Sequence, residues 1–223
     1  MLPEIGPAGQ ERLQRSSALI VGLGGLGSPV ALYLAAAGVG RLGLCDADTV
    51  DLSNLQRQVL YTEADVGRPK AVCAARRLQA LSSATTFDVW PHRFEGDIAD
   101  TLTAGYDLIV DCTDNFATRF LIDDACRRHR RPWVHGSIGG FYGQVAVFVP
   151  GGSGLADLLA DRDDLCSRPA ARDGVLGAVP GVIGSLQAVE ALKLLSGAEG
   201  VATLASRLLT IDLKTMQISI IDI

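Results

Sequence analysis

Hydrophobic and polar positions along the chain predict strands and helices in alternation. Short apolar runs predict strands at residues 18–22, 41–46, 85–90, 107–111, 132–135 and 144–149, and helical patterns cover residues 26–37, 64–81, 115–130 and 175–195. Strands that alternate with helices form parallel sheets with crossover helices. Residues 208–212 and 216–221 flank a short turn and predict a closing hairpin. The pattern therefore predicts an α/β fold: a doubly wound, mainly parallel sheet extended by antiparallel strands at its C-terminal end.

One stretch, residues 150–173, interrupts this alternation. It opens with a glycine-rich turn and continues with the charged run Asp161, Arg162, Asp163 and Asp164, a composition that predicts a mobile loop. No repeat and no low-complexity segment divides the rest of the chain. We therefore expect a single domain over residues 1–223.

Composition and charge disfavour several classes of protein. The 223 residues carry a formal net charge of −5, which disfavours nucleic-acid binding. Residues 18–40 lack charge, but their six glycines and one proline favour strand, turn and helix over a membrane span. The five cysteines are scattered and form no C-x-x-C pair, so we expect no zinc and a reducing, cytoplasmic location.

A glycine-rich turn follows the first predicted strand. Gly22, Gly24, Gly25 and Gly27 end an apolar strand and open a helix, so that backbone N–H groups can approach phosphate oxygens. Asp46 ends the next predicted strand, where an acid accepts hydrogen bonds from ribose hydroxyls. Together these residues predict a Rossmann-like nucleotide site, although the glycines alone do not separate NAD, FAD and ATP.

Polar side chains after that second strand predict contacts with phosphates. Ser53, Asn54, Gln56 and Arg57 follow one another closely, and a guanidinium can bind phosphate through two hydrogen bonds. Lys70, near the start of the next predicted helix, adds a compact positive charge. A dinucleotide site has no role for such an arginine, so this loop favours a triphosphate over NAD.

Acidic residues close the fourth predicted strand. Asp111, Asp114 and Asn115 stand at its carboxyl end, where open α/β sheets bind ligands. Their oxygens suit a Mg²⁺ that keeps several waters and bridges substrate phosphates, and we predict that Asp114 binds it. Either Asp114 or Asn115 could also cap the following helix. His135, alone in an apolar strand, is expected to be a satisfied core residue.

Taken together, these motifs resemble the MoeB/ThiF/HesA family of E1-like adenylyltransferases, relatives of the ubiquitin-activating enzymes. The resemblance extends from about residue 4 to residue 197, and its order and spacing make it specific. The segments that carry it are residues 22–27, 46–48, 53–58, 67–70, 111–115 and 181–188. Residues 139–144 lean toward the ThiF branch.

The resemblance implies an enzyme that uses ATP and Mg²⁺ to adenylate the C-terminal Gly-Gly carboxylate of a ubiquitin-like sulfur-carrier protein, with release of pyrophosphate. It implies a homodimer and a place in thiamin or molybdopterin biosynthesis. Carried over by position, it implies a glycine facing the nucleotide, a ribose acid, phosphate-binding side chains and a magnesium ligand: Gly25, Asp46, Asn54, Gln56, Arg57, Lys70 and Asp114, with Asn115 beside it.

Three features depart from the family pattern. Members usually carry an Arg-Tyr-x-Arg-Gln stretch before the segment matching residues 2–6, and its arginine reaches the partner protomer's ATP site. We therefore expect either an upstream start or an impaired enzyme. The two C-x-x-C pairs that bind structural zinc in many members are absent. The usual loop cysteine is Ala170 here, with Cys166 displaced, which disfavours a covalent sulfur-transfer intermediate.

Two other interpretations stay open. A non-catalytic E1-like partner subunit would bind a ubiquitin-like protein without activating it, and the intact set of Arg57, Lys70 and Asp114 disfavours this. An NAD-dependent oxidoreductase would need a second, substrate-binding domain, and the chain has no room for one beyond residue 150.

Overall fold

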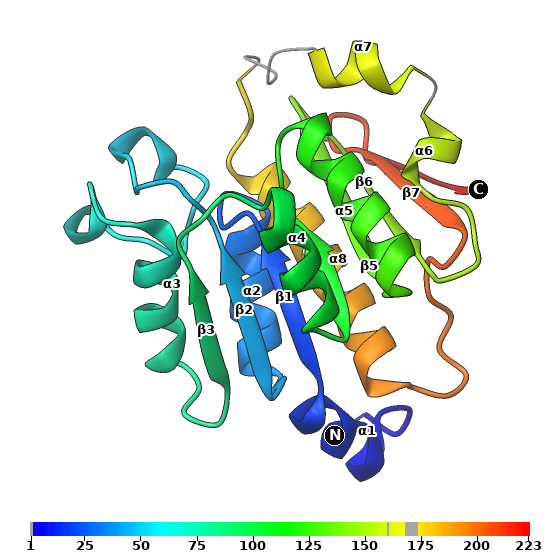
Figure 1. The fold of residues 1–223 in the computed structure, drawn as a ribbon, viewed down its shortest axis with the longest axis horizontal. Coiled ribbons are helices and arrows are strands. Elements are labelled where there is room, and N and C mark those ends of the chain that lie inside the picture. Colours follow the sequence, from blue (N-terminus) through cyan, green and yellow to red (C-terminus); the bar gives the residue numbers. More distant parts are fainter. Residues whose placement is uncertain (1, 160, 168–173) are drawn as a thin grey trace.

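An eight-stranded mixed sheet organises the computed structural model, which describes residues 2–159, 161–167 and 174–223. The strand order is β3-β2-β1-β4-β5-β6-β7-β8 (Figure 1). The parallel part consists of β1 (Ser17–Val21), β2 (Arg41–Cys45), β3 (Thr86–Trp90), β4 (Leu108–Asp111) and β5 (Trp133–Gly139). The antiparallel part consists of β6 (Tyr142–Phe148), β7 (Arg207–Asp212) and β8 (Gln217–Asp222). The predicted mainly parallel sheet with antiparallel C-terminal strands is confirmed.

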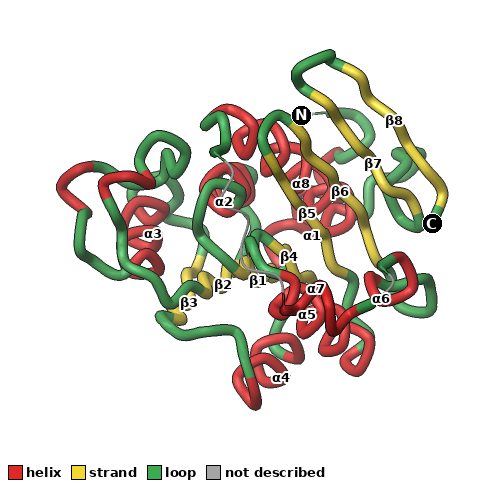
Figure 2. The backbone as a smooth tube through the Cα atoms, turned by 90° about the horizontal axis from the view of Figure 1, so that it is seen from above, coloured by secondary structure: helices red, strands yellow, loops and turns green. Residues whose placement is uncertain are grey.

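Helices cover both faces of the parallel strands, as the view from above shows (Figure 2). One face carries α2 (Gly27–Ala36), α3 (Lys70–Gln79) and α8 (Ala178–Ser196). The other face carries α4 (Gly96–Ala104) and α5 (Phe116–His129). Three further helices pack on these layers, α1 (Gly6–Arg15) against α8, and the short α6 (Leu155–Leu158) and α7 (Arg162–Ser167) against α5. The sheet is therefore doubly wound.

The hydrophobic core consists of two layers because the central strands are apolar on both sides. Along β1, Ala18 and Ile20 pack into one cluster, whereas Leu19 and Val21 pack into the other. All five residues of β1 are buried, as expected for a parallel strand with helices on both faces. By contrast, every residue of β8 is exposed, so the sheet loses its cover toward the C-terminal edge.

Several elements differ from the sequence prediction. Helix α3 begins at Lys70 rather than at residue 64, because Gly67 adopts a φ of 81° and Pro69 forms the helix cap. Strands β5 and β6 extend toward each other into a hairpin. Helices α1 and α4 were not predicted; among their apolar side chains α1 buries Leu13, and α4 buries Ala99 and Leu102.

The interrupted stretch 150–173 contains two short helices, α6 and α7. An ion pair at 2.7 Å between Arg162 of α7 and Asp124 of α5 holds the second of them on the main body. Residues 160 and 168–173 lie outside the described residues, and Ala170 is among them. The mobility of the whole stretch stays a prediction.

Helix α8 is the one helix within the described ranges that is long and apolar enough to cross a membrane. Length and composition alone give this result, and the helix packs against α2, β5 and β6. Residues 18–40, the apolar stretch noted in the sequence, form β1, a turn and α2 as predicted.

Candidate functional site

The predicted site residues lie at the carboxyl ends of the parallel strands, which point toward the upper part of Figure 1. The glycine-rich turn follows β1, and the loop that contains Asp114 follows the neighbouring strand β4. The strand order reverses between β1 and β4, since β2 and β3 lie on one side and β5 on the other. Ligands of open α/β sheets bind at such a switch point.

Close backbone approaches explain why the turn consists of glycines. Gly22 has a φ of 90°, and a β-carbon there would lie 2.7 Å from the carbonyl oxygen of Cys112. A β-carbon at Gly27 would overlap the carbonyl oxygen of Gly22 itself. The turn after β1 and the loop after β4 are therefore packed backbone to backbone.

Asp46 follows β2 at the border of the same site, and its side chain supports the glycine turn directly. Its carboxylate accepts hydrogen bonds from the backbone N–H of Leu23 at 2.7 Å and of Asp48 at 2.8 Å. Burial raises the pKa of Asp46, and the charge of Lys70 offsets this only in part. Each oxygen keeps a free lone pair, so the carboxylate can accept a further hydrogen bond. Its role toward a ribose stays a prediction.

The loop after β2 places Arg57 over the glycine turn. The 3₁₀ turn at Leu52–Asn54 begins with Asp51, which accepts hydrogen bonds from both the N–H and the hydroxyl of Ser53. Arg57 donates to the Ser53 carbonyl at 3.4 Å, and its side-chain Cγ would lie 3.6 Å from a β-carbon at Gly25. No carboxylate of the described ranges forms an ion pair with Arg57, so its charge is available to a ligand.

Of the remaining loop residues, Asn54 is half-buried and Gln56 is exposed. The Asn54 amide lies 3.5 Å from the Ser53 hydroxyl, and Gln56 approaches Gly177 just before α8. The structure thus brings the loop, the glycine turn and the start of α8 together.

Lys70 is buried and already has a partner. Its side chain is 7% exposed, and its Nζ lies 3.0 Å from a carboxylate oxygen of Asp48, which is itself 72% exposed. The backbone N–H of Lys70 also donates to the Asp48 carbonyl at 2.9 Å. These contacts tie the start of α3 to the exit of β2. A phosphate that approaches Lys70 must compete with Asp48.

Three polar side chains at the end of β4 and in the loop after it, those of Asp111, Asp114 and Asn115, have different surroundings. Asn115 caps α5, because its Oδ1 accepts a hydrogen bond at 2.9 Å from the N–H of Thr118. Asp114 is exposed, whereas Asp111 is fully buried and is held by Thr113 and His135. The two alternatives for the cap are thereby decided in favour of Asn115. Of the two aspartates, only Asp114 is accessible to a metal.

A magnesium ion fits this donor set. Within residues 2–159, 161–167 and 174–223, no three His, Cys, Asp or Glu side chains cluster in a way that could hold a metal. Mg²⁺ does not need such a cluster, since it binds through one or two carboxylates together with water and substrate phosphates. Cys112 is buried, and its burial raises the pKa of the thiol well above the ordinary value. This agrees with a packing role for Cys112.

Sequence reasoning missed several residues that support the site. The hydroxyl of Tyr61 donates to the Leu23 carbonyl at 2.9 Å, and Gln58 is buried beside Gly24. Arg119 donates to the Thr113 carbonyl at 2.8 Å. The sequence shows these residues only as polar side chains near apolar ones, and this pattern does not reveal which group each side chain binds.

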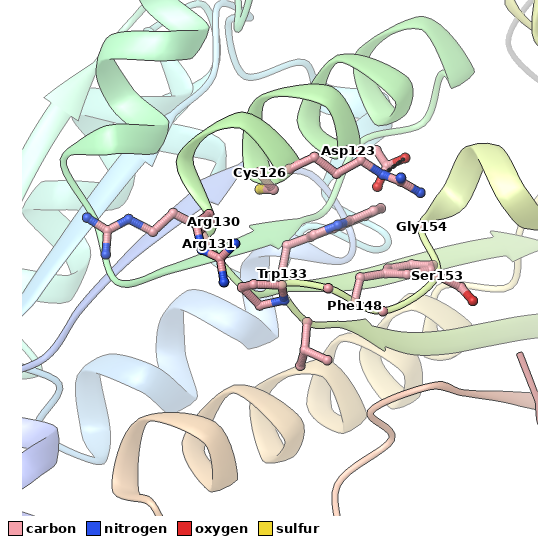
Figure 3. Close-up of a pocket in the computed structure, with 13 residues that line it drawn as sticks. Asp123, Cys126, Arg130, Arg131, Trp133, Phe148, Ser153 and Gly154 are labelled. Carbon is pink, nitrogen blue, oxygen red and sulfur yellow. Dashed lines mark ion pairs between the residues drawn. The ribbon is translucent and has the colours of Figure 1, made fainter.

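A separate pocket of about 350 Å³ lies near the opposite, amino-terminal end of β5 (Figure 3). It is lined by the end of α5, by Trp133 and Phe148, and by the turn at residues 149–154. One of its three lining arginines, Arg127, forms ion pairs with Asp123 at 3.5 Å and with Asp157. None of the predicted site residues contributes to this pocket.

The chain belongs to the ThiF family, which matches residues 1–223. It is 48% identical over 204 residues to a sulfur carrier protein adenylyltransferase from Thermus thermophilus, a match that spans 88% of this chain and 75% of that protein. It is 43% identical over 217 residues to a SAMP-activating enzyme E1 from Haloferax volcanii, spanning 97% and 80%. It spans about half the length of several other curated relatives.

Among solved structures, a crystal structure of E. coli MccB with ATP matches with a TM-score of 0.83. The match covers 96% of this chain and 66% of MccB, at 23% identity, and supports the fold alone. The family comparison confirms the resemblance identified from the motifs. The choice between the ThiF branch and the other branches stays a prediction.

Proposed function

We propose that this protein adenylates the C-terminal Gly-Gly carboxylate of a ubiquitin-like sulfur-carrier protein, with ATP as the second substrate. The activities for which its relatives are named, sulfur carrier protein adenylyltransferase and SAMP-activating enzyme E1, support this class of reaction. The observation that carries the proposal is that Arg57, which forms no ion pair among residues 2–159, 161–167 and 174–223, and the exposed Asp114 flank one glycine turn.

In the proposed reaction a carboxylate oxygen of the carrier attacks the α-phosphorus of ATP, and the bond to pyrophosphate breaks. Negative charge grows on the leaving diphosphate. Arg57 and Lys70 supply fixed positive charge for it, and the glycine turn supplies backbone N–H groups. In this proposal the protein mainly positions the reactants and stabilises charge.

Asp114 would hold a Mg²⁺, with Asn115 fixing the start of α5 beside it. Bound there, the metal would neutralise phosphate charge as a Lewis acid. Asp46 would accept hydrogen bonds from the ribose hydroxyls, and Gly22, Gly24, Gly25, Gly27, Ser53, Asn54 and Gln56 would complete the nucleotide site. Zinc has no part in this proposal.

We further propose that the protein acts as a homodimer, in the cytoplasm, without nucleic acid or membrane. Exposed apolar side chains on α8 and α2, including Val182, Val189 and Tyr33, support a contact with a second copy. Whether the product serves thiamin, molybdopterin or another thiolated metabolite depends on the carrier.

The test is ATP–pyrophosphate exchange in the presence of candidate carriers that end in Gly-Gly. We expect exchange that requires the carrier and that falls by at least about 100-fold in Asp114→Ala. Asp97→Ala, an exposed aspartate on α4, serves as the matched control and should keep full exchange. Tight carrier binding with no exchange by the unmodified protein would instead support a non-catalytic partner subunit.

A further inference from the structure

A buried histidine–aspartate pair lies directly beneath the loop that contains Asp114. Asp111, the last residue of β4, is the register partner of His135 in the first half of β5. The Nδ1 of His135 lies 2.8 Å from Oδ2 of Asp111, and both side chains are shielded from water, at 3% and 0% exposure. Neither residue has a place in the proposed reaction itself.

The charges of this pair identify which atom carries the proton. Burial lowers the pKa of His135, which favours the neutral imidazole. Burial opposes ionisation of Asp111, yet the hydrogen bond from His135 and the charge of Arg119 lower the pKa of Asp111 overall. An ionised Asp111 accepts hydrogen bonds only, so His135 donates through a protonated Nδ1. Arg119, 3.8 Å away, balances the buried charge.

Asp111 in turn holds the loop after β4 through hydrogen bonds to Thr113. Its Oδ1 accepts hydrogen bonds from the Thr113 hydroxyl at 2.6 Å and from the Thr113 N–H at 3.0 Å. Arg119 donates to the Thr113 carbonyl at 2.8 Å, and Gln187 of α8 donates to the Asp111 carbonyl at 2.6 Å. Thr113 is thus held at three of its polar atoms, and the next residue is Asp114.

We propose that His135 is a positioning residue: it fixes the Asp111 carboxylate so that the turn through Thr113 presents Asp114 to the metal. The inference rests on the proposed function, in which Asp114 binds Mg²⁺. Partners of this kind, one step removed from a metal ligand, typically change metal affinity when they are replaced.

Three variants separate hydrogen bonding from packing. His135→Asn keeps an N–H donor near the place of Nδ1, whereas His135→Leu removes the donor. Trp133→Phe is the packing control, because Trp133 lies two residues earlier on β5, is buried and contacts the His135 ring edge to face. Each variant and the unmodified protein are measured at temperatures chosen so that their free energies of unfolding are equal.

The first measurement is amide hydrogen exchange of Thr113 by NMR in the ligand-free protein, which requires no catalytic activity. We expect exchange about 10-fold faster in His135→Leu, and rates close to the unmodified protein in His135→Asn and Trp133→Phe. The second is the half-saturating Mg²⁺ concentration for ATP binding by calorimetry. We expect an increase of about 10- to 100-fold in His135→Leu, restored in His135→Asn.

An unchanged Thr113 exchange rate in His135→Leu would overturn the inference. So would equal weakening of Mg²⁺-dependent binding in His135→Leu and Trp133→Phe, since that pattern reports packing alone. Failure of the proposed function would give a different result. The unmodified protein would then show no carrier-dependent ATP–pyrophosphate exchange, while His135→Leu would still speed the amide hydrogen exchange of Thr113.

Discussion

Two aspartates stand at the carboxyl ends of β2 and β4, the parallel strands on either side of β1, and they behave in opposite ways. Asp46 follows β2 and Asp111 ends β4, and each accepts a hydrogen bond from the backbone N–H two residues later. Burial raises the pKa of Asp46. The pKa of Asp111 is lowered although Asp111 is the more deeply buried of the two.

The difference lies in the partners that the fold supplies. Asp111 meets the His135 donor and the Arg119 guanidinium, which stabilise its charge inside the protein. Asp46 has two backbone N–H donors and the more distant charge of Lys70. Asp111 is therefore saturated and structural, whereas Asp46 retains capacity for a hydrogen-bonding ligand.

The largest expected effect is on stability. Asp111→Asn removes the charge that balances buried Arg119, and we expect the free energy of unfolding to fall by about 3–5 kcal/mol. Asp46→Asn leaves no buried cation unpaired and should change the free energy of unfolding by less than about 1 kcal/mol at neutral pH. Urea denaturation of both variants measures the contrast. Equal losses would contradict the distinction between the two aspartates.

The next effect concerns the ligand. Asp46→Ala removes the acceptor proposed for the ribose, and we expect ATP affinity to fall by roughly 1.5–3 kcal/mol, or about 10- to 100-fold. Calorimetric titration with ATP measures this. Asp97→Ala, an exposed aspartate of α4 on the other face of the sheet, is the control and should bind ATP normally.

The two aspartates should also give opposite pH dependences of stability. A raised pKa in the folded state means that Asp46 contributes stability below its unfolded pKa of about 3.9, and that this is lost as the pH rises through its folded pKa. Asp111, with a lowered pKa, contributes above about 3.9 and loses this contribution as the pH falls. Subtracting the unfolding free energy of Asp46→Asn from that of the unmodified protein at each pH isolates the Asp46 term. A difference that grows with rising pH would contradict the first expectation.

The smallest effect is expected at the ion pair of Lys70. Asp48 is mostly exposed, so Asp48→Asn should change the free energy of unfolding by less than about 1 kcal/mol. The same variant frees Lys70 and should slightly strengthen ATP binding, in contrast to Asp46→Ala. Weaker binding would show that Asp48 orients Lys70 rather than competes with the phosphate.

Much of the fold could be predicted because its signals are local. Residues 18–21 of β1 are all apolar, and the closely spaced glycines that follow mark a tight strand–helix junction. Helix α1 could not be predicted, since it buries little beyond Gly9 and Leu13. The start of α3 was misplaced because the pattern continues through Gly67, whose positive φ ends the preceding turn.

The candidate site was predictable in part for the same reason. Arg57, Lys70 and Asp114 were singled out by residue type and spacing, and each lies at the carboxyl edge of the sheet. The pairing of Lys70 with Asp48 was not anticipated, because the two residues are 22 positions apart and meet only when α3 docks beside the exit of β2.

The amino-acid sequence by itself determined the alternation of strands and helices, the glycine turn and the family to which the chain belongs, because periodicity and motif spacing are properties of neighbouring residues. Tertiary structure alone decided that Asn115 caps a helix, that Asp114 is left exposed, and that Asp111 is saturated. Asp111 and His135 are 24 residues apart, and Asp111 and Gln187 are 76 apart. Hydrogen bonds and charges act over distances in space, and only the folded sheet brings these atoms within reach.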